Sequence, residues 1–186
     1  MKVVALHQNL ERLIKSAIKQ NRKAQHSLFE MYSPKMLSVC RYYIKDVHNA
    51  EEVMLDGFFK VFINLHKFQF NGSFEGWIRK TMVRQAIDFL RGQKEVVFTE
   101  EGNYTVKEEA GEFELFQDDY LQNLIDHLPE GYKMVFVLYA IEGYKHNEIA
   151  EMLNISEGTS KSQLSRARRM LQEQLKQANN NNYGTK

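Results

Sequence analysis

Apolar residues recur every three to four positions over most of this chain, and only two prolines interrupt the pattern. This spacing places apolar side chains on one face of an α-helix, whereas a strand would require apolar and polar residues to alternate. Leu, Lys, Glu and Gln, which favour helices, are frequent. The sequence therefore predicts an all-α protein. Its 186 residues can bury one ordinary core or two small ones.

Charges are segregated along the chain, although the formal net charge is only +1. Residues 79–94 hold five basic side chains against one acid, and residues 159–177 again hold five against one. Residues 95–119 hold nine acids against one base. Because local charge governs binding more than net charge does, the two basic segments favour a nucleic-acid partner.

The composition of the middle of the chain predicts two helical domains. Residues 93–119 lack helical periodicity and contain Gly102 and Gly111, which is typical of a linker. We therefore expect domains at 1–92 and 120–177, an acidic linker at 93–119 and a polar, disordered tail at 178–186.

Neither a membrane span nor a cofactor site is predicted. The longest apolar run, Met134 to Ile141, is far too short to cross a bilayer, and Val3 to Leu6 is too brief for the core of a signal peptide. The single cysteine, Cys40, excludes an internal disulfide and a multi-thiolate metal site. We expect a cytoplasmic protein without membrane insertion, metal or cofactor, in which Cys40 is a small core residue.

Helix boundaries in the first domain follow from capping signals. A first helix is predicted from Leu6 to Gln20, and a second begins near Arg22 and stops before Ser33-Pro34. That dipeptide is typical of a cap followed by a first-turn proline and would open a third helix. Asn49 to Glu52 has the form of a capping box and would open a fourth.

The fourth helix carries two neighbouring apolar stripes. One comprises Val53, Gly57, Val61 and Leu65, and the other Met54, Phe58 and Phe62. The pattern leaves open whether this helix is buried over a wide face or is partly an exposed docking surface.

The last helix of the first domain would be capped by Ser73 and run to about Arg91. Its core face is Ile78, Met82, Ala86 and Leu90, and a different face carries Trp77, Lys80, Arg84, Asp88 and Arg91 within about 80°. An aromatic ring beside cations suits an unpaired base and a phosphate backbone. A solvated basic face with Trp77 half-buried remains the alternative.

The second domain contains a helix-turn-helix pattern after a helix from Glu130 to Ile141. Asn147 to Leu153 forms a short helix, Asn154 to Ser156 a tight turn, and Glu157 opens a longer helix. Two sets of residues would be inward-facing: Ile149, Ala150 and Leu153, then Leu164, Ala167, Leu171 and Leu175. Outward-facing hydroxyl and cationic groups suited to base edges and phosphates are Lys161, Ser162, Ser165, Arg166 and Arg169. An ordinary helical hairpin is the alternative.

At these residues the sequence resembles the extracytoplasmic-function group of the sigma-70 family of bacterial RNA polymerase sigma factors. NEIAEMLNISEGTSKSQLSRARRML resembles region four, which binds the −35 element. AEEVMLDGFFKVF resembles region 2.2, which docks on the polymerase clamp, and FNGSFEGWIRKTMVRQAIDFLR resembles regions 2.3 and 2.4, which melt and read the −10 element.

The resemblance implies a non-enzymatic factor that binds core RNA polymerase at its clamp and flap, recognises promoter DNA and promotes its melting. The implied polymerase-binding residues are Glu52, Leu55 and Asp56. The implied −10 residues are Phe70, Ser73, Phe74, Trp77, Lys80, Arg84 and Arg91, and the implied −35 residues are those of the outward face from Lys161 to Arg169. The acidic linker would occupy the basic RNA path of the enzyme, and an anti-sigma factor is an expected further partner.

Four positions depart from the family pattern. Leu55 stands at a usual glutamine and Arg84 at a usual asparagine; Ser160 replaces a valine and Gln163 an arginine. The last two imply looser core packing and one missing phosphate contact.

Two other functions remain to be separated from this one. An ordinary transcriptional regulator would explain residues 120–177 equally well but not the Trp77 face. A helical enzyme finds little support, because the six histidines are scattered, His146-Asn147-Glu148 lacks the second histidine of a zincin, and there is no phosphate-binding glycine loop.

Overall fold

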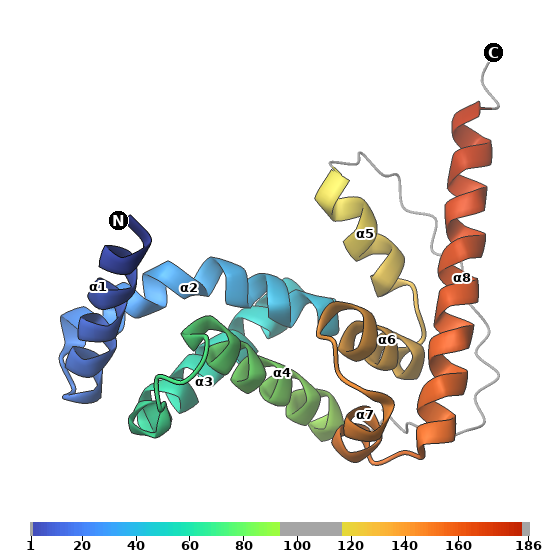
Figure 1. The fold of residues 1–186 in the computed structure, drawn as a ribbon. Helices are drawn as coiled ribbons and strands as arrows, with labels where there is room; N and C mark the ends of the chain where they lie inside the picture. The colour runs from blue at the N-terminus through green and yellow to red at the C-terminus, as the bar shows by residue number, and fades with distance from the viewer. Residues whose placement is uncertain (1, 94–116, 184–186) are drawn as a thin grey trace. The chain divides into compact units, whose positions relative to one another are not determined.

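The computed structural model describes residues 2–93 and 117–183, with side chains described for 9–93 and 120–177 (Figure 1). The chain divides into two compact units, Met1–Gly92 and Gln93–Lys186. The described residues form helices and no strands, which confirms the predicted all-α, two-domain fold. Most of the predicted acidic linker lies outside the described residues, although its last three positions already belong to a helix that begins at Gln117.

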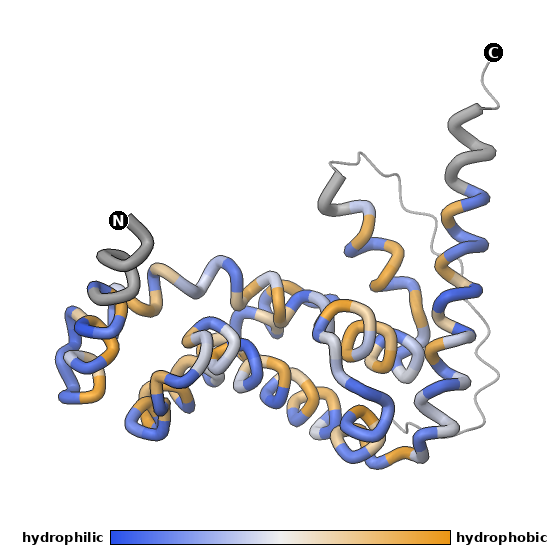
Figure 2. The backbone as a smooth tube through the Cα atoms, in the orientation of Figure 1, coloured by the Kyte–Doolittle hydropathy of each residue, from blue (hydrophilic) through white to orange (hydrophobic). Residues whose placement is uncertain are grey.

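The described residues of the first unit form four α-helices and one short 3-10 turn. These are α1 (Lys2–Ile18), α2 (Arg22–Tyr43), α3 (Val47–Asn64), η1 (Leu65–Lys67) and α4 (Phe74–Gly92). Helices α2, α3 and α4 pack pairwise around one core, while α1 packs on α2 and η1. Figure 2 shows polar and apolar residues interspersed along each of these helices, as expected of amphipathic helices.

The predicted core stripes of α3 and α4 are confirmed. Val53, Val61 and Leu65 of the first stripe and all four predicted α4 positions are buried. At Gly57, an added Cβ would collide with the Met82 sulfur. Gly57 therefore allows the backbone of α3 to approach the buried Met82 side chain of α4 closely.

The predicted break at Ser33-Pro34 is wrong, because α2 continues through Pro34 to Tyr43. Proline lacks the N–H group that would bond one turn back, which normally interrupts a helix. Here Tyr32, Met36 and Val39 are buried on either side of Pro34, while Pro34 itself is exposed. Core packing on both sides holds the helix continuous.

The predicted start of the helix at Asn49 is also wrong by about one turn. Helix α3 begins at Val47, and the Asp46 carboxylate accepts a hydrogen bond from the Asn49 amide at 2.8 Å. Asp46 is thus the side-chain cap that satisfies a first-turn N–H group.

Cys40 is fully buried on α2, and this burial raises the pKa of its thiol to about 12. A thiol with so high a pKa forms little reactive thiolate at neutral pH. The interpretation of Cys40 as a small core residue is confirmed.

The second unit comprises α5 (Gln117–Asp126), α6 (Glu130–Phe136), a π-helical turn η2 (Val137–Ile141), α7 (His146–Leu153) and α8 (Glu157–Tyr183). Helices α5, α6 and α7 all pack on α8. The Lys133 ammonium lies 2.8 Å from an Asp126 carboxylate oxygen, and both side chains are buried. This buried ion pair joins α6 to the end of α5.

Three details of the second unit differ from the sequence prediction. The single helix expected from Glu130 to Ile141 ends in the π-helical turn. Leu175 is 39% exposed rather than inward-facing, since the core around Ala167 and Leu171 ends one turn before it. The expected disordered tail is helical through Tyr183, because extending an existing helix avoids the cost of nucleation.

Candidate polymerase and nucleic-acid interfaces

The polymerase-binding residues predicted from the sequence share one exposed face of α3. Glu52, Leu55 and Asp56 are exposed, and Leu55 has 54% of its surface accessible. Phe59 and Ile63 are 67% and 54% exposed and lie with them within about 100° on the helix. We call these five residues the α3 outer face.

Both interpretations of this helix are therefore partly right. It is buried over the two predicted stripes except at Phe62, which is half-buried, and Phe58 packs edge-on against Phe29 at 4.9 Å between ring centroids. It also exposes a third apolar stripe. Sequence reasoning missed Phe59 and Ile63, although their four-residue spacing from Leu55 was a usable signal.

The segment between η1 and α4 is organised around the ring of Phe68. The Phe68 centroid lies 5.0 Å from that of Phe70, 5.1 Å from Phe74 and 5.7 Å from Trp77. The predicted cap is present, because the Gly76 amide donates a hydrogen bond to Ser73 Oγ at 3.2 Å. The packed rings and the cap hold the start of α4 in a fixed relation to the preceding loop.

A cleft of about 340 Å³ opens on one side of this segment. It contains three of the predicted −10 residues, Ser73, Trp77 and Lys80, and adds Lys67 and Asn71. Trp77 is half-buried, so part of its ring borders the cleft. An indole surface, two ammonium groups and an amide form a setting suited to a base and its phosphates.

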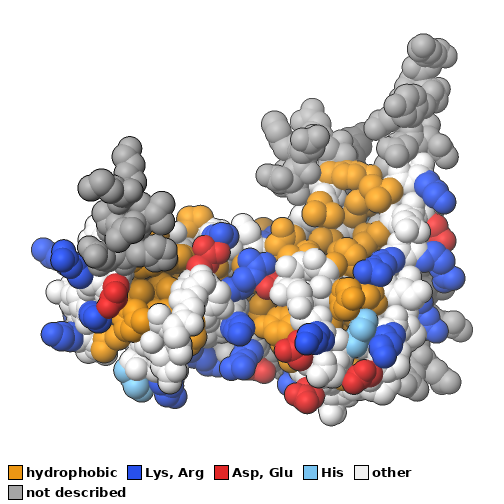
Figure 3. Space-filling model, viewed as in Figure 1, with side chains coloured by type: hydrophobic (Ala, Val, Ile, Leu, Met, Phe, Trp, Pro, Cys, Tyr) orange, Lys and Arg blue, Asp and Glu red, His pale blue; other side chains and the backbone are white. Residues whose placement is uncertain are grey.

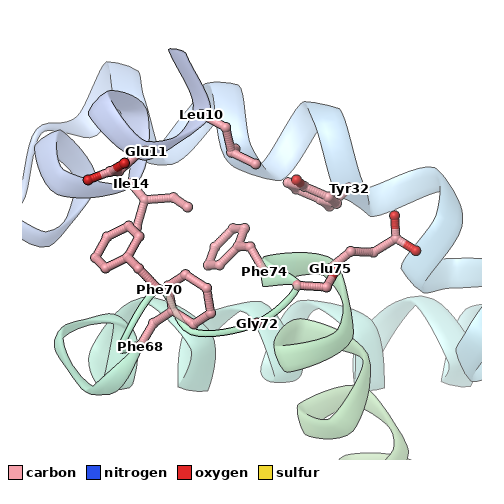
Figure 4. A pocket seen from close by; sticks show the side chains of 10 residues that line it. Leu10, Glu11, Ile14, Tyr32, Phe68, Phe70, Gly72, Phe74 and Glu75 are labelled. Carbon is pink, nitrogen blue, oxygen red and sulfur yellow. The ribbon is translucent and has the colours of Figure 1, made fainter. Parts of the chain in front are cut away.

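Phe70 and Phe74 instead line a cavity of about 500 Å³ on the α1 side of the same segment (Figure 4). Leu10 and Ile14 of α1 and Tyr32 of α2 complete its apolar wall. The structure thus divides five of the predicted −10 residues between two spaces, and among these five only Ser73 borders both. Arg84 and Arg91 are not among the lining residues of either space.

The inclusion of Phe74 among DNA-contacting residues is corrected by its burial. Only 4% of Phe74 is exposed, and its ring stacks on Trp77 at 6.0 Å with an interplanar angle of 15°. Phe74 therefore supports the Trp77 ring from within. Phe70 is 38% exposed and adopts a positive φ of 59°, a conformation that an aromatic residue rarely takes.

The basic stripe continues along α4 beyond the cleft. Lys80, Arg84 and Arg91 are exposed, as predicted, and Asp88 is exposed among them. Glu75 at the start of the helix is paired with Lys35 of α2 at 2.6 Å. That ion pair connects α4 to α2 on the side of the η1–α4 segment that faces the cavity of about 500 Å³.

The helix-turn-helix geometry in the second unit is confirmed. Asn154 ends α7 in a left-handed conformation with φ of 56°, which asparagine tolerates. Ser156 Oγ accepts a hydrogen bond from the Thr159 amide at 2.9 Å and so caps α8. Ile149 and Leu153 are buried in the seam, whereas Ala150 is partly exposed.

All five predicted outward residues of α8 are exposed, and we call them the recognition face: Lys161, Ser162, Ser165, Arg166 and Arg169. Basic side chains lie along α8 in the space-filling view (Figure 3). Arg166 Nη1 donates a hydrogen bond to the Tyr132 hydroxyl at 3.3 Å, which orients its guanidinium group. Lys161 and Arg169 pair at the surface with carboxylates of their own helix, Glu157 at 3.6 Å and Glu173 at 4.0 Å.

The two departures on α8 occupy buried positions. Ser160 is fully buried, and its Oγ lies 2.9 Å from His146 Nδ1. Gln163 is 4% exposed and packs against Gly131, so a side chain at this position does not reach a phosphate from the recognition face. Sequence reasoning missed the contact between His146 and Ser160. The two residues are fourteen positions apart and lie on different helices, so the three- to four-residue spacing within one helix does not predict that they meet.

None of the helices in the described ranges is long and apolar enough to cross a membrane.

Two family models match the chain: Sigma-70 region 2 over residues 28–96 and Sigma-70 region 4 over residues 118–171. Each match falls largely within one of the two units.

Individual relatives agree with the family models. The chain is 30% identical to the ECF RNA polymerase sigma factor SigW of Bacillus subtilis, covering 90% of this chain and 99% of that protein. It is 29% identical to the RNA polymerase sigma factor SigV of the same organism, covering 72% and 80%.

A solved structure supports the fold. The sigma factor RpoE in complex with the anti-sigma factor NepR from Bartonella quintana matches with a TM-score of 0.51 and 20% identity, covering 81% of this chain and 96% of that one. The two family matches and the nearly full-length match to SigW together show to which family the chain belongs. The chain belongs to the extracytoplasmic-function (ECF) group of the sigma-70 family of RNA polymerase sigma factors.

Proposed function

We propose that this chain initiates transcription by binding core RNA polymerase, recognising the −35 and −10 promoter elements and promoting DNA melting. The observation that carries the proposal is the order of the two units on one chain, a region 2 unit followed by a region 4 unit. A regulator with only a helix-turn-helix would leave the first unit without a function. The protein makes and breaks no bond itself and acts in the cytoplasm.

The α3 outer face is the proposed binding surface for the polymerase clamp. Its centre is apolar, with Leu55, Phe59 and Ile63 exposed, and two carboxylates, Glu52 and Asp56, lie beside it. An apolar centre with charges at its border is the usual anatomy of a protein interface. The apolar side chains would supply most of the affinity, and the carboxylates would select a basic partner surface.

The cleft beside Trp77 is the proposed site for the displaced strand of the −10 element. An extruded base would stack on the exposed part of the Trp77 ring, whose inner face is supported by Phe74. Lys67 and Lys80 line the cleft, and Arg84 lies one turn further along α4, so these cations would hold the adjoining phosphates. Arg91 would extend that contact.

The recognition face of α8 is the proposed reader of the −35 element. Its hydroxyl and guanidinium groups can bond to base edges in a major groove, while Lys161 contacts phosphate. The polymerase flap and an anti-sigma factor are further proposed partners, the latter by analogy with the factor named in the matched complex.

Reconstituted transcription tests this function directly. Purified chain is added to core polymerase with fragmented DNA of its own genome, and transcription starts are mapped. We expect starts that share two spaced upstream elements and that core polymerase alone does not produce. The same set of starts with and without the chain would contradict the proposal.

A further inference from the structure

A cleft in the second unit lies between η2, α7 and α8 and overlaps one side of the recognition face. Its volume is about 460 Å³, and Tyr139, His146, Lys161, Arg168 and Arg169 line it together with Ser165. We call it the Arg168 cleft. Three basic side chains and no acidic one are among its lining residues. That composition suits an anion.

The imidazole of His146 is fixed in this cleft from two directions. Its ring stacks on Tyr139 with 4.6 Å between centroids, and its Nδ1 lies 2.9 Å from the buried Ser160 Oγ. The Arg168 guanidinium lies 5.6 Å from the centroid of the same Tyr139 ring. With Nδ1 engaged, Nε2 is the ring nitrogen left for a ligand. Because a hydroxyl can donate or accept, the contact to Ser160 survives either protonation state of the ring.

The surroundings of His146 favour its neutral form in the free protein. Partial burial is the largest cause that lowers the pKa of His146, and the positive charge of Lys161 lowers it further. The negative charge of Glu157 raises this pKa, and the positive charge of Arg168 lowers it by a smaller amount. On its own helix, Lys145 and Glu148 of the capping box are the nearest charges in sequence. An anion in the cleft would reverse this balance, because it would stabilise the imidazolium.

We propose that the Arg168 cleft binds a phosphate group of the DNA backbone, next to the bases that the recognition face contacts, with His146 as a proton-coupled ligand. The phosphate would accept hydrogen bonds from Arg168, Lys161 and the Tyr139 hydroxyl, and from Nε2 of protonated His146. Continuity with the recognition face, which shares Lys161, Ser165 and Arg169, identifies the anion as backbone phosphate. The inference rests on the proposed binding of upstream DNA.

The sign of the pH dependence follows from proton linkage. The pKa of His146 is lowered in the free protein and rises when phosphate is bound, so the complex carries more protons. Affinity for DNA therefore increases as pH falls through the pKa of the bound state. A difference of about one unit between the two states corresponds to at most about a tenfold change.

The test uses the full chain in complex with core polymerase and a fluorescent duplex carrying the upstream element. Affinity is measured at several salt concentrations near pH 6 and near pH 8 for the wild type, Arg168→Gln and His146→Asn. Asparagine can keep a polar group near Ser160 but does not titrate. His127→Asn, which removes an exposed histidine of the same unit outside the cleft, is the matched control.

We expect Arg168→Gln to weaken binding about tenfold and to lower the slope of log affinity against log salt by about one. The wild type and His127→Asn should bind several-fold more tightly at the lower pH, and His146→Asn should lose that difference. Arg168→Gln with unchanged affinity and slope, or His146→Asn with unchanged pH dependence, would overturn the inference. Wild-type complex with no preference for the upstream element would overturn the proposed function as well, which separates the two failures. Arg168 is exposed, so its variant remains informative even if His146→Asn folds poorly.

Discussion

Replacing Phe59 by alanine should weaken binding to core polymerase without weakening the fold. A fully covered aromatic side chain buries about 150 to 250 Å², and Phe59 is 67% exposed. Covering the exposed part would remove about 100 to 170 Å² from water, equivalent to about 2.5 to 4 kcal/mol at about 25 cal/mol per Å². Since alanine retains its own Cβ and a partner rarely covers a side chain completely, we expect a loss of about 2 kcal/mol, roughly 30-fold in affinity.

Competition with labelled wild-type chain for core polymerase measures this loss, and thermal unfolding measures stability. Val61→Ala is the matched control, because Val61 lies on the buried side of the same helix and is 1% exposed. It should cost about 1 to 3 kcal/mol of stability, while its folded fraction binds polymerase normally. If Phe59→Ala competes as well as the wild type, the α3 outer face is not the polymerase interface.

Three other substitutions test the remaining assignments. Trp77→Ala should leave closed-complex formation nearly intact but slow the appearance of permanganate-reactive thymines, since stacking is worth about 1 to 3 kcal/mol per base; normal melting by a folded variant would remove Trp77 from the mechanism. Arg166→Ala should weaken binding to the upstream element by about 1 to 3 kcal/mol and relax the sequence preference of the protein in a binding assay. Unchanged sequence preference would contradict the assignment of the recognition face. Lys133→Met should reduce the free energy of unfolding by about 3 to 5 kcal/mol because it removes the positive charge that compensates the buried Asp126 carboxylate, which then keeps a hydrogen bond from Gln122 but no opposite charge from Lys133; adding Asp126→Leu should restore much of the loss. A double variant no more stable than the single one would argue against that explanation.

The amphipathic helices were predictable because burial in this protein follows helical periodicity. The buried stripe of α4 from Ile78 to Leu90 could be predicted from its four-residue spacing alone, and the start of α8 could be predicted from the capping residue Ser156 alone. The break expected at Pro34 failed for a tertiary reason. A proline's local penalty of about 3 kcal/mol competes with packing on both sides of it, and packing cannot be read from the dipeptide.

The division of the −10 residues was beyond sequence reasoning for a related reason. Phe70, Phe74 and Trp77 are all aromatic and close in sequence, so pattern alone ranks them equally. Their separation depends on the positive φ of Phe70 and on α1, which forms the far wall of the cavity behind the loop. Local composition identified the segment, and only the three-dimensional arrangement distinguishes Trp77 at the open cleft from Phe74 beneath it.

Ser160 shows why a departure from a family pattern is best judged together with its spatial partner. A buried hydroxyl at a position usually held by valine predicts looser packing and the cost of an unsatisfied polar group. That cost is avoided here because the hydroxyl meets His146 Nδ1 from another helix. The exchange has a functional consequence that valine could not supply, since the same contact holds the imidazole against Tyr139 and at the wall of a basic cleft. An apolar seam would fix the two helices equally well but would leave the ring free to turn, so the serine contributes more to the position of His146 than to the packing of α8.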